Sequence, residues 1–172
     1  IVSGGELQRT IAVGCDPKKV IFSGVGKLAE EIDLALKVGI GCFNVESGSE
    51  LDRIIERAII LGKQAPISIR VNPNIDPRTH PYISTGLKEN KFGVSTSQAI
   101  DLYRISKNNP HINIVGIDCH IGSQIMEVAP LEESLTNLLG LAETLRNEGI
   151  EVQHIDIGGG IGVRYRDEPA FD

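Results

Sequence analysis

Five segments of the chain carry apolar residues at the spacing of an α-helix. In one of them Leu51, Ile54, Ile55 and Ala58 recur at positions i, i+3, i+4 and i+7 and would form one apolar face. The same pattern, weaker in places, predicts helices over residues 6–13, 28–36, 51–59, 97–107 and 131–145. Three predicted helices follow a serine with Glu or Gln three positions later, the spacing of a capping box: Ser3, Ser47 and Ser95. Four of them end just before a glycine, which readily closes a helix: Gly14, Gly39, Gly62 and Gly149.

Short apolar runs lie between these helices and predict β-strands. The runs span residues 20–22, 42–45, 67–71, 114–119 and 152–157, with Ile1 and Val2 as a candidate sixth strand. Nearly continuous apolar strands that alternate with amphipathic helices are typical of a parallel sheet covered by helices. No break in this alternation divides the chain, so residues 1–172 are expected to form one domain.

Polar residues at the strand ends favour one of two folds that fit this pattern, a doubly wound sheet and a partial TIM barrel. Each predicted strand is followed by groups that a core would exclude: Ser23, Glu46 with Ser47, Arg70 with Asn72, His120, and Gly158 to Gly160. A barrel builds its functional site from such a ring at the carboxyl ends of its strands. We therefore predict an α/β fold, a TIM-type (β/α)8 barrel that is only partly present.

Composition and charge narrow the classes of function. A chain of 172 residues with 41% hydrophobic and 23% charged residues has the make-up of a globular domain. The net charge of −6 argues against nucleic acid as the main partner, and no apolar run reaches the roughly 20 residues of a membrane span. Cys15, Cys42 and Cys119 lack zinc spacing and are expected to be small buried residues of a reducing, cytoplasmic compartment. The start has neither an initiator Met nor a signal-peptide pattern, so we expect the beginning of the gene product to be missing.

Gly158, Gly159, Gly160 and Gly162 directly follow the last predicted strand. Glycines leave backbone N–H groups open to an anion, and barrels commonly bind phosphate after their seventh and eighth strands. The alternative is a tight turn that needs positive φ angles, although three successive glycines exceed what a turn requires.

His120 and Arg70 are the other candidates for chemistry. His120 follows a strand, where it could act as an acid or base, a metal ligand, a platform for a ring, or a structural residue. No second histidine lies at metal spacing, so no metal site is expected. Arg70 ends an apolar strand and needs an acceptor such as a phosphate, a phenolate or a carboxylate. The carboxylate could be that of Glu46, one strand earlier. An ion pair with Glu46 would be compatible with contact between Arg70 and a phosphate or a phenolate.

The turn around Gly24 resembles two nucleotide-binding motifs. A P-loop fails because position 21 is Ile instead of Gly and Leu28 replaces Ser or Thr. Gly24-x-Gly26-x-x-Ala29 fits a dinucleotide fingerprint better, since it follows a strand, opens a helix and has Glu46 about 20 residues later. An NAD-dependent oxidoreductase therefore remains an alternative, beside a simple strand-to-helix turn.

Taken together, seven stretches resemble the diaminopimelate decarboxylases, which belong to the PLP-dependent decarboxylases with an alanine-racemase-like barrel. These stretches are residues 2–7, 22–27, 42–47, 70–73, 80–93, 119–124 and 156–160. The stretch from His80 to Gly93 is the most specific of them. The resemblance implies a (β/α)8 barrel that holds pyridoxal 5'-phosphate, followed by a C-terminal β domain. This chain would cover about strands 2 to 7 of the barrel, without the first strand and the β domain.

The resemblance also implies roles for individual residues. His120 would stack on the cofactor ring, Arg70 would stand near its phenolic oxygen, and Lys91 would lie on a loop near a dimer interface. The phosphate would be held by Ser123 and by the backbone of Gly158, Gly159 and Gly160. The family's Schiff-base lysine would precede residue 1, so no catalytic residue and no metal ligand is assigned in this chain.

The implied activity of the full-length protein is PLP-dependent decarboxylation of meso-2,6-diaminopimelate to L-lysine and CO2, the last step of lysine biosynthesis. The implied partners are the amino-acid substrate and a second copy in a homodimer, and this chain alone is expected to be inactive. One alternative is a PLP decarboxylase acting on ornithine or arginine. Another is a PLP-binding barrel protein without catalytic activity.

Overall fold

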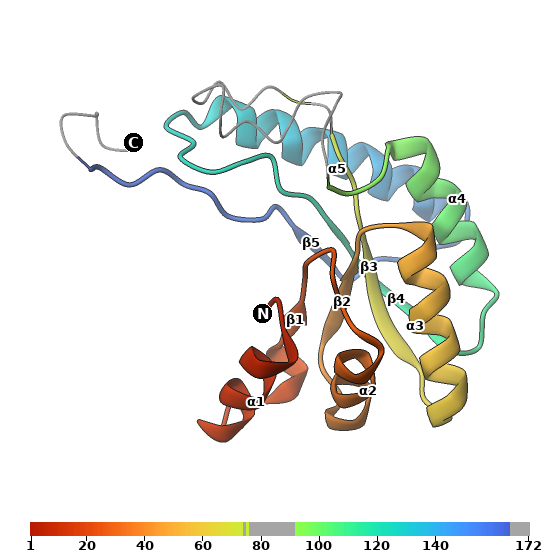
Figure 1. Cartoon of the computed structure of the whole chain (residues 1–172). Coiled ribbons are helices and arrows are strands. Elements are labelled where there is room, and N and C mark those ends of the chain that lie inside the picture. The colour runs from red at the N-terminus through yellow and green to blue at the C-terminus, as the bar shows by residue number, and fades with distance from the viewer. Residues whose placement is uncertain (74, 76–91, 166–172) are drawn as a thin grey trace.

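The computed structural model describes residues 1–73, 75 and 92–165 (Figure 1). The most specific stretch of the resemblance lies largely outside these residues, and so does Lys91. Within the described ranges, no helix combines the length and the apolarity that a membrane span needs.

All five predicted helices and all five predicted strands are present. The helices are α1 (Gly4–Ala12), α2 (Ala29–Val38), α3 (Gly48–Leu61), α4 (Thr96–Lys107) and α5 (Ala129–Asn147), with a 3-10 turn at Pro17–Lys19. The strands are β1 (Ile21–Phe22), β2 (Cys42–Val45), β3 (Ala65–Arg70), β4 (Ile112–Asp118) and β5 (His154–Asp156). The candidate sixth strand at the start is not formed. Its backbone nevertheless lies beside β1, since the Ser23 N–H donates to the Ile1 carbonyl at 2.9 Å.

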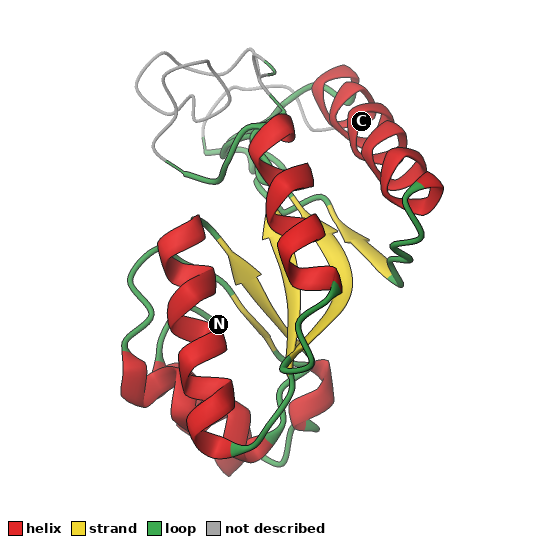
Figure 2. Cartoon of the chain, turned by 90° about the vertical axis from the view of Figure 1, so that its right-hand side faces the viewer, coloured by secondary structure: helices red, strands yellow, loops and turns green. Residues whose placement is uncertain are grey.

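The order of the strands identifies the sheet as part of a barrel. All described pairs are parallel, and the strands lie side by side in chain order, β1-β2-β3-β4-β5. A doubly wound sheet would reverse its order at a switch point. Crossovers that always advance in one direction place the helices on one face, and Figure 2 shows the helices on one side of a curved sheet. The predicted partial (β/α) barrel is therefore confirmed.

The helix ends show where local sequence sets the structure. The Ser47 hydroxyl accepts the Glu50 N–H at 3.2 Å at the start of α3, and Gly62 ends that helix in the left-handed conformation. The complete capping box forms at Ser95, where the Gln98 side chain also accepts the Ser95 N–H. A complete box at Ser47 is not formed, because the Glu50 carboxylate turns to Lys27 and to the Glu46 N–H instead.

The core lies between the sheet and the helices. Tyr103 of α4 is fully buried, and its hydroxyl accepts the Ile69 N–H at 3.0 Å and donates to the Gly116 carbonyl at 2.7 Å. The β3–β4 register shifts between Ile67 and Ser68, so the hydroxyl bridges backbone groups close to this irregularity. Cys42 and Cys119 are buried as predicted, whereas the prediction was wrong for Cys15, which is partly exposed on the loop after α1.

Candidate functional site

The loops after β4 and β5 lie against each other at the carboxyl ends of the strands. The Ile125 N–H donates to the Gly160 carbonyl at 2.8 Å, and the Gly162 N–H donates to the Ile125 carbonyl at 2.9 Å. The structure thus brings together the His120 stretch and the glycine run, which are far apart in the sequence but end neighbouring parallel strands.

The three glycines of the run have different local requirements. A Cβ on Gly158 would lie 2.6 Å from Nδ1 of His120, and one on Gly160 would overlap the Gly122 carbonyl oxygen. Both residues also have positive φ angles, +73° and +89°. Gly159 has neither constraint, because a Cβ there would meet no atom of the described residues within 4 Å and its φ is not left-handed. A tight turn explains Gly158 and Gly160 but leaves Gly159 unexplained, whereas space kept open for a ligand accounts for Gly159.

The hydrogen bonds of the glycine run determine which of its backbone N–H groups a ligand could use. The Gly158 N–H donates to Oδ1 of Asp156 at 2.8 Å, and the Gly159 N–H makes a long bond of 3.3 Å to Nδ1 of His120. Nδ1 is therefore an acceptor, and the proton of a neutral imidazole sits on Nε2. Burial, and next the positive charge of Arg70, lower the pKa of His120, which favours the neutral form of the half-buried ring.

Ser123 lies on the same rim. Its side chain is exposed, and its hydroxyl makes no hydrogen bond to any residue that the structure describes. The hydroxyl is thus available to a ligand at the mouth of the barrel.

Arg70 at the end of β3 is held by the carboxylate that the sequence indicated. Nη1 of Arg70 lies 2.8 Å from Oε1 of Glu46, and the guanidinium lies 5.5 Å from the Phe92 ring centroid. Oε2 of Glu46 accepts the Gly93 N–H at 3.2 Å. The predicted ion pair is confirmed, and contact between Arg70 and a cofactor oxygen stays a prediction.

Asn44 is an important residue of this site to which sequence reasoning gave no role. It is 1% exposed in the middle of β2, and its side-chain amide bonds side chains from other parts of the sheet. Nδ2 donates to Ser23 Oγ at 3.1 Å and to Asp156 Oδ2 at 3.4 Å, while Oδ1 accepts from Ser68 Oγ at 2.5 Å. The sequence could have indicated this role of Asn44, because a polar residue inside an apolar strand needs a partner. Asn44 interrupts Cys42–Val45, and Ser68 interrupts Ile67–Val71.

Asp118 and Asp156 add negative charge beneath the site. They are register partners at the ends of β4 and β5, and Asp118 is also the register partner of Arg70. Burial, reinforced by the charge of Asp156, raises the pKa of Asp118 to about 7, although the charge of Arg70 opposes this. Asp118 therefore carries a proton for part of the time at neutral pH.

The Gly24 turn does not bind a nucleotide in the way its pattern suggested. Lys27 points into the protein, and its Nζ donates to the carbonyls of Gly24 and Asn44, both at 2.7 Å, and to Oε1 of Glu50 at 2.6 Å. The sheet also lacks the reversal of strand order at which dinucleotides bind. The dinucleotide interpretation is wrong for this reason, and the glycines serve a strand-to-helix turn.

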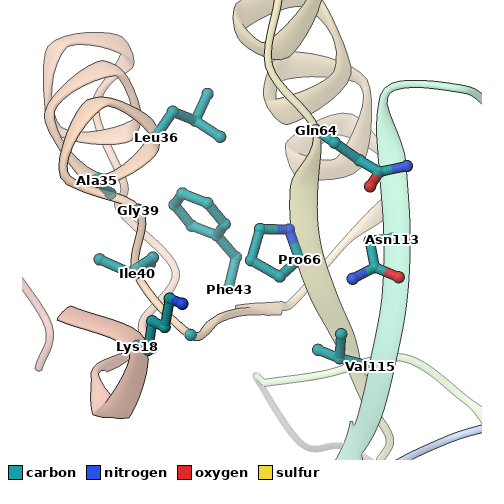
Figure 3. Close-up of a pocket in the computed structure, with 11 residues that line it drawn as sticks. Lys18, Ala35, Leu36, Gly39, Ile40, Phe43, Gln64, Pro66, Asn113 and Val115 are labelled. Atoms are coloured by element: carbon teal, nitrogen blue, oxygen red, sulfur yellow. The ribbon is translucent and has the colours of Figure 1, made fainter. Parts of the chain in front are cut away.

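Metal-binding groups and cavities are two other kinds of site that a fold of this size can hold. The described residues contain no group of three or more His, Cys, Asp or Glu side chains that could hold a metal ion. A cavity of about 370 Å³ is lined by residues such as Lys18, Gln64 and Asn113 (Figure 3). It lies where β3 and β4 begin, so it is at the opposite end of the sheet from His120.

A partial parallel barrel, with a glycine run and an imidazole at the carboxyl ends of its strands, fits the class of PLP-binding (β/α) barrels. Residues 1–172 match the family model described as pyridoxal-dependent decarboxylase, pyridoxal binding domain. The chain belongs to this family, whose cofactor is PLP.

Similar proteins agree with this assignment. The chain is 54% identical to the diaminopimelate decarboxylase of Pseudomonas aeruginosa and 56% identical to that of Haemophilus influenzae, over 98% of the chain in both cases. The crystal structure of diaminopimelate decarboxylase from Helicobacter pylori complexed with L-lysine superposes with a TM-score of 0.93 at 48% identity. That match covers 98% of this chain and 43% of the other. The chain spans about 40% of the length of the two curated relatives.

Proposed function

We propose that the full-length protein containing this chain is a PLP-dependent carboxy-lyase that converts meso-2,6-diaminopimelate to L-lysine and CO2. The observation that carries the cofactor site is Gly159, which neither sterics nor backbone conformation requires and which borders open space beside His120. The substrate follows from the relatives, which are named diaminopimelate decarboxylases and match the whole chain at more than 50% identity.

The side chains at the strand ends suit PLP. Bound PLP supplies an electron sink for the electron pair left when CO2 departs. His120 offers a half-buried ring face for stacking. Gly160 and Ser123 offer donors for the phosphate, and the Gly159 N–H, whose bond to His120 is long at 3.3 Å, is a third. Gly158 contributes the close approach of the two loops, because its own N–H is held by Asp156. Arg70 offers a positive charge for the phenolic oxygen of the ring.

The residues of this chain would bind and orient the cofactor. Holding the ring between a phosphate anchor and a stacked imidazole keeps the bond to be broken in the orientation that the electron sink needs. Lys27 is no candidate for the Schiff-base lysine, because three acceptors already surround its ammonium group. We propose that this lysine lies elsewhere in the full-length protein and that the present chain alone is inactive.

Location and assembly belong to the same proposal. We propose a cytoplasmic homodimer, for which the three free cysteines fit a reducing compartment and the family resemblance supplies the dimer. Sedimentation of the purified full-length protein tests the dimer directly.

The activity is tested on the full-length protein with PLP, supplied in turn with meso-diaminopimelate, ornithine and arginine. We expect CO2 and lysine from diaminopimelate alone. His120→Ala should lower kcat/KM at least about 100-fold, since both ring stacking and the loop contact are lost. His111→Ala is the matched control, because this partly exposed histidine lies just before β4, at the other end of the strand.

Each other outcome contradicts a definite part of the proposal. Turnover of ornithine or arginine in place of diaminopimelate would keep the cofactor and overturn the substrate. Binding of PLP without turnover of any amino acid would indicate a non-catalytic barrel protein. Failure to bind PLP would overturn the function altogether.

A further inference from the structure

A buried ion pair, Lys27 with Glu50, lies next to the site but is not part of the group of residues that would contact the cofactor. Nζ of Lys27 and Oε1 of Glu50 are 2.6 Å apart, and the two residues are 2% and 7% exposed. Burial raises the pKa of Glu50 against the opposing charge of Lys27, which shows that the carboxylate pays a desolvation cost to be there. Buried ion pairs add little stability compared with apolar residues of similar size, so stability alone is a weak reason for this one.

Hydrogen bonds connect the Lys27–Glu50 pair to Arg70 through Glu46. The second oxygen of Glu50, Oε2, accepts the backbone N–H of Glu46 at 3.1 Å. Glu46 in turn binds Nη1 of Arg70 with Oε1 and the Gly93 N–H with Oε2. Lys27 also donates to the Asn44 carbonyl, two residues before Glu46, so the end of β2 is held on both sides. The four residues form a continuous relay, Lys27–Glu50–Glu46–Arg70, in which Glu50 bonds the backbone N–H of Glu46 and the other two links join side chains.

Arg70 needs such a relay because two carboxylates, Glu46 and Asp118, compete for it. Its charge acts on Asp118, its register partner, as well as on Glu46 and His120. If the backbone at Glu46 shifted, the guanidinium could pair with Asp118 and turn away from the mouth of the barrel. A side chain that several partners can attract is held in one position only if one partner is itself fixed.

We propose that Lys27 and Glu50 are positioning residues that anchor Glu46 and thereby aim Arg70 at the cofactor. That the relay serves PLP binding rests on the proposed function, whereas the claim that it holds Arg70 in place does not. The relay also gives the Gly24–Lys27 turn a role, since the glycine-rich turn delivers a lysine to the interior instead of binding a phosphate.

The decisive variant is the double substitution Lys27→Met with Glu50→Leu in the full-length protein. Apolar residues of similar size avoid leaving one buried charge unpaired. They cannot bind the Glu46 N–H or the carbonyls of Gly24 and Asn44, so the double variant should lose some stability. Glu50→Gln is the milder companion, since its amide can still accept from Lys27. Asp33→Asn is the matched control, because it breaks the Arg57–Asp33 ion pair between α2 and α3, which has no link to Arg70.

Two measurements follow Arg70 in these variants. In cofactor-free protein, labelling of Arg70 by phenylglyoxal, read by peptide mass spectrometry, reports how firmly the guanidinium is held. In the second measurement, a PLP titration gives the Kd. We expect faster Arg70 labelling and an about tenfold higher Kd in both relay variants, the effect of one lost hydrogen bond to a charged group. Asp33→Asn should leave both values unchanged.

The outcomes separate the relay from the proposed function. Wild-type labelling and Kd in a folded double variant would show that the pair is only structural and would overturn the inference. If the unsubstituted protein fails to bind PLP, the proposed function falls, and the labelling arm alone decides the relay. Faster labelling with an unchanged Kd would overturn the role of the relay in cofactor binding. If the double variant does not fold, the same criteria apply to Glu50→Gln.

Discussion

Replacing Gly160 and Gly159 by alanine, one at a time, should change different properties of the full-length protein. At Gly160 the φ angle of +89° costs an L residue about 1–2 kcal/mol. The new methyl group would also overlap the Gly122 carbonyl, and such overpacking costs about 1–3 kcal/mol. Gly160→Ala should therefore lower the free energy of unfolding by about 2–5 kcal/mol, a large share of the 5–15 kcal/mol typical of a domain.

At Gly159 the folded chain accepts the same methyl group without strain. In the part of the chain that the structure describes, no atom lies within 4 Å of the added Cβ, so the free energy of unfolding should change by less than about 0.5 kcal/mol. The methyl group would instead occupy the space proposed for the phosphate. Loss of one hydrogen bond to that charged group, about 1.5–3 kcal/mol, would raise the Kd for PLP about 10- to 100-fold.

Chemical denaturation of the cofactor-free protein and a PLP titration measure the two quantities independently. Gly140→Ala serves as a control, because Gly140 lies inside α5 with open space around it, and alanine should stabilise the protein by about 0.5–1 kcal/mol. A normal Kd in Gly159→Ala would refute the reasoning that this glycine is kept open for the phosphate. Normal stability in Gly160→Ala would refute the steric argument for the loop.

Three further predictions concern other parts of the site and fold. Asp118 has a folded-state pKa raised to about 7, so the folded state keeps its proton while the unfolded state loses it near pH 4. The free energy of unfolding should therefore fall by about 2–3 kcal/mol between pH 5 and pH 8. Urea denaturation of Asp118→Asn should show a smaller fall over the same range. If the variant has the same pH dependence as the unsubstituted protein, the raised pKa of Asp118 is contradicted. Tyr103→Phe should cost about 2–3 kcal/mol in the same assay, because the Ile69 N–H and the Gly116 carbonyl lose a buried partner; a cost below 1 kcal/mol would contradict this. Ser47→Ala should cost about 1 kcal/mol through loss of the α3 cap, and Ser49→Ala beside it should cost less.

Local patterns were sufficient to predict the elements of the fold. Apolar periodicity and the capping serines placed each helix within a few residues of its observed bounds. The strand ends were less accurate, since β5 covers residues 154–156 of the predicted 152–157 and β4 begins two residues earlier than predicted. Strand bounds depend on pairing with a neighbour, and the pairing partner is not visible in a local pattern.

By itself, the sequence determined the order of strands and helices, the polar residues at the strand ends, and the Arg70–Glu46 pair. These follow from short-range periodicity and from the rule that parallel strands present their carboxyl ends at one edge. The family resemblance added the prediction that PLP is the cofactor, and it supplied the candidate roles of His120 and the glycines.

Only the tertiary structure decided which polar residues work together. The Asn44–Asp156 bond joins residues 112 positions apart, and the Lys27–Glu50 bond joins residues 23 positions apart. It also distinguished Gly159, which borders open space, from Gly158 and Gly160, which the neighbouring loop constrains. These distinctions depend on how closely two loops approach after the sheet has formed, and no spacing along the chain encodes that distance.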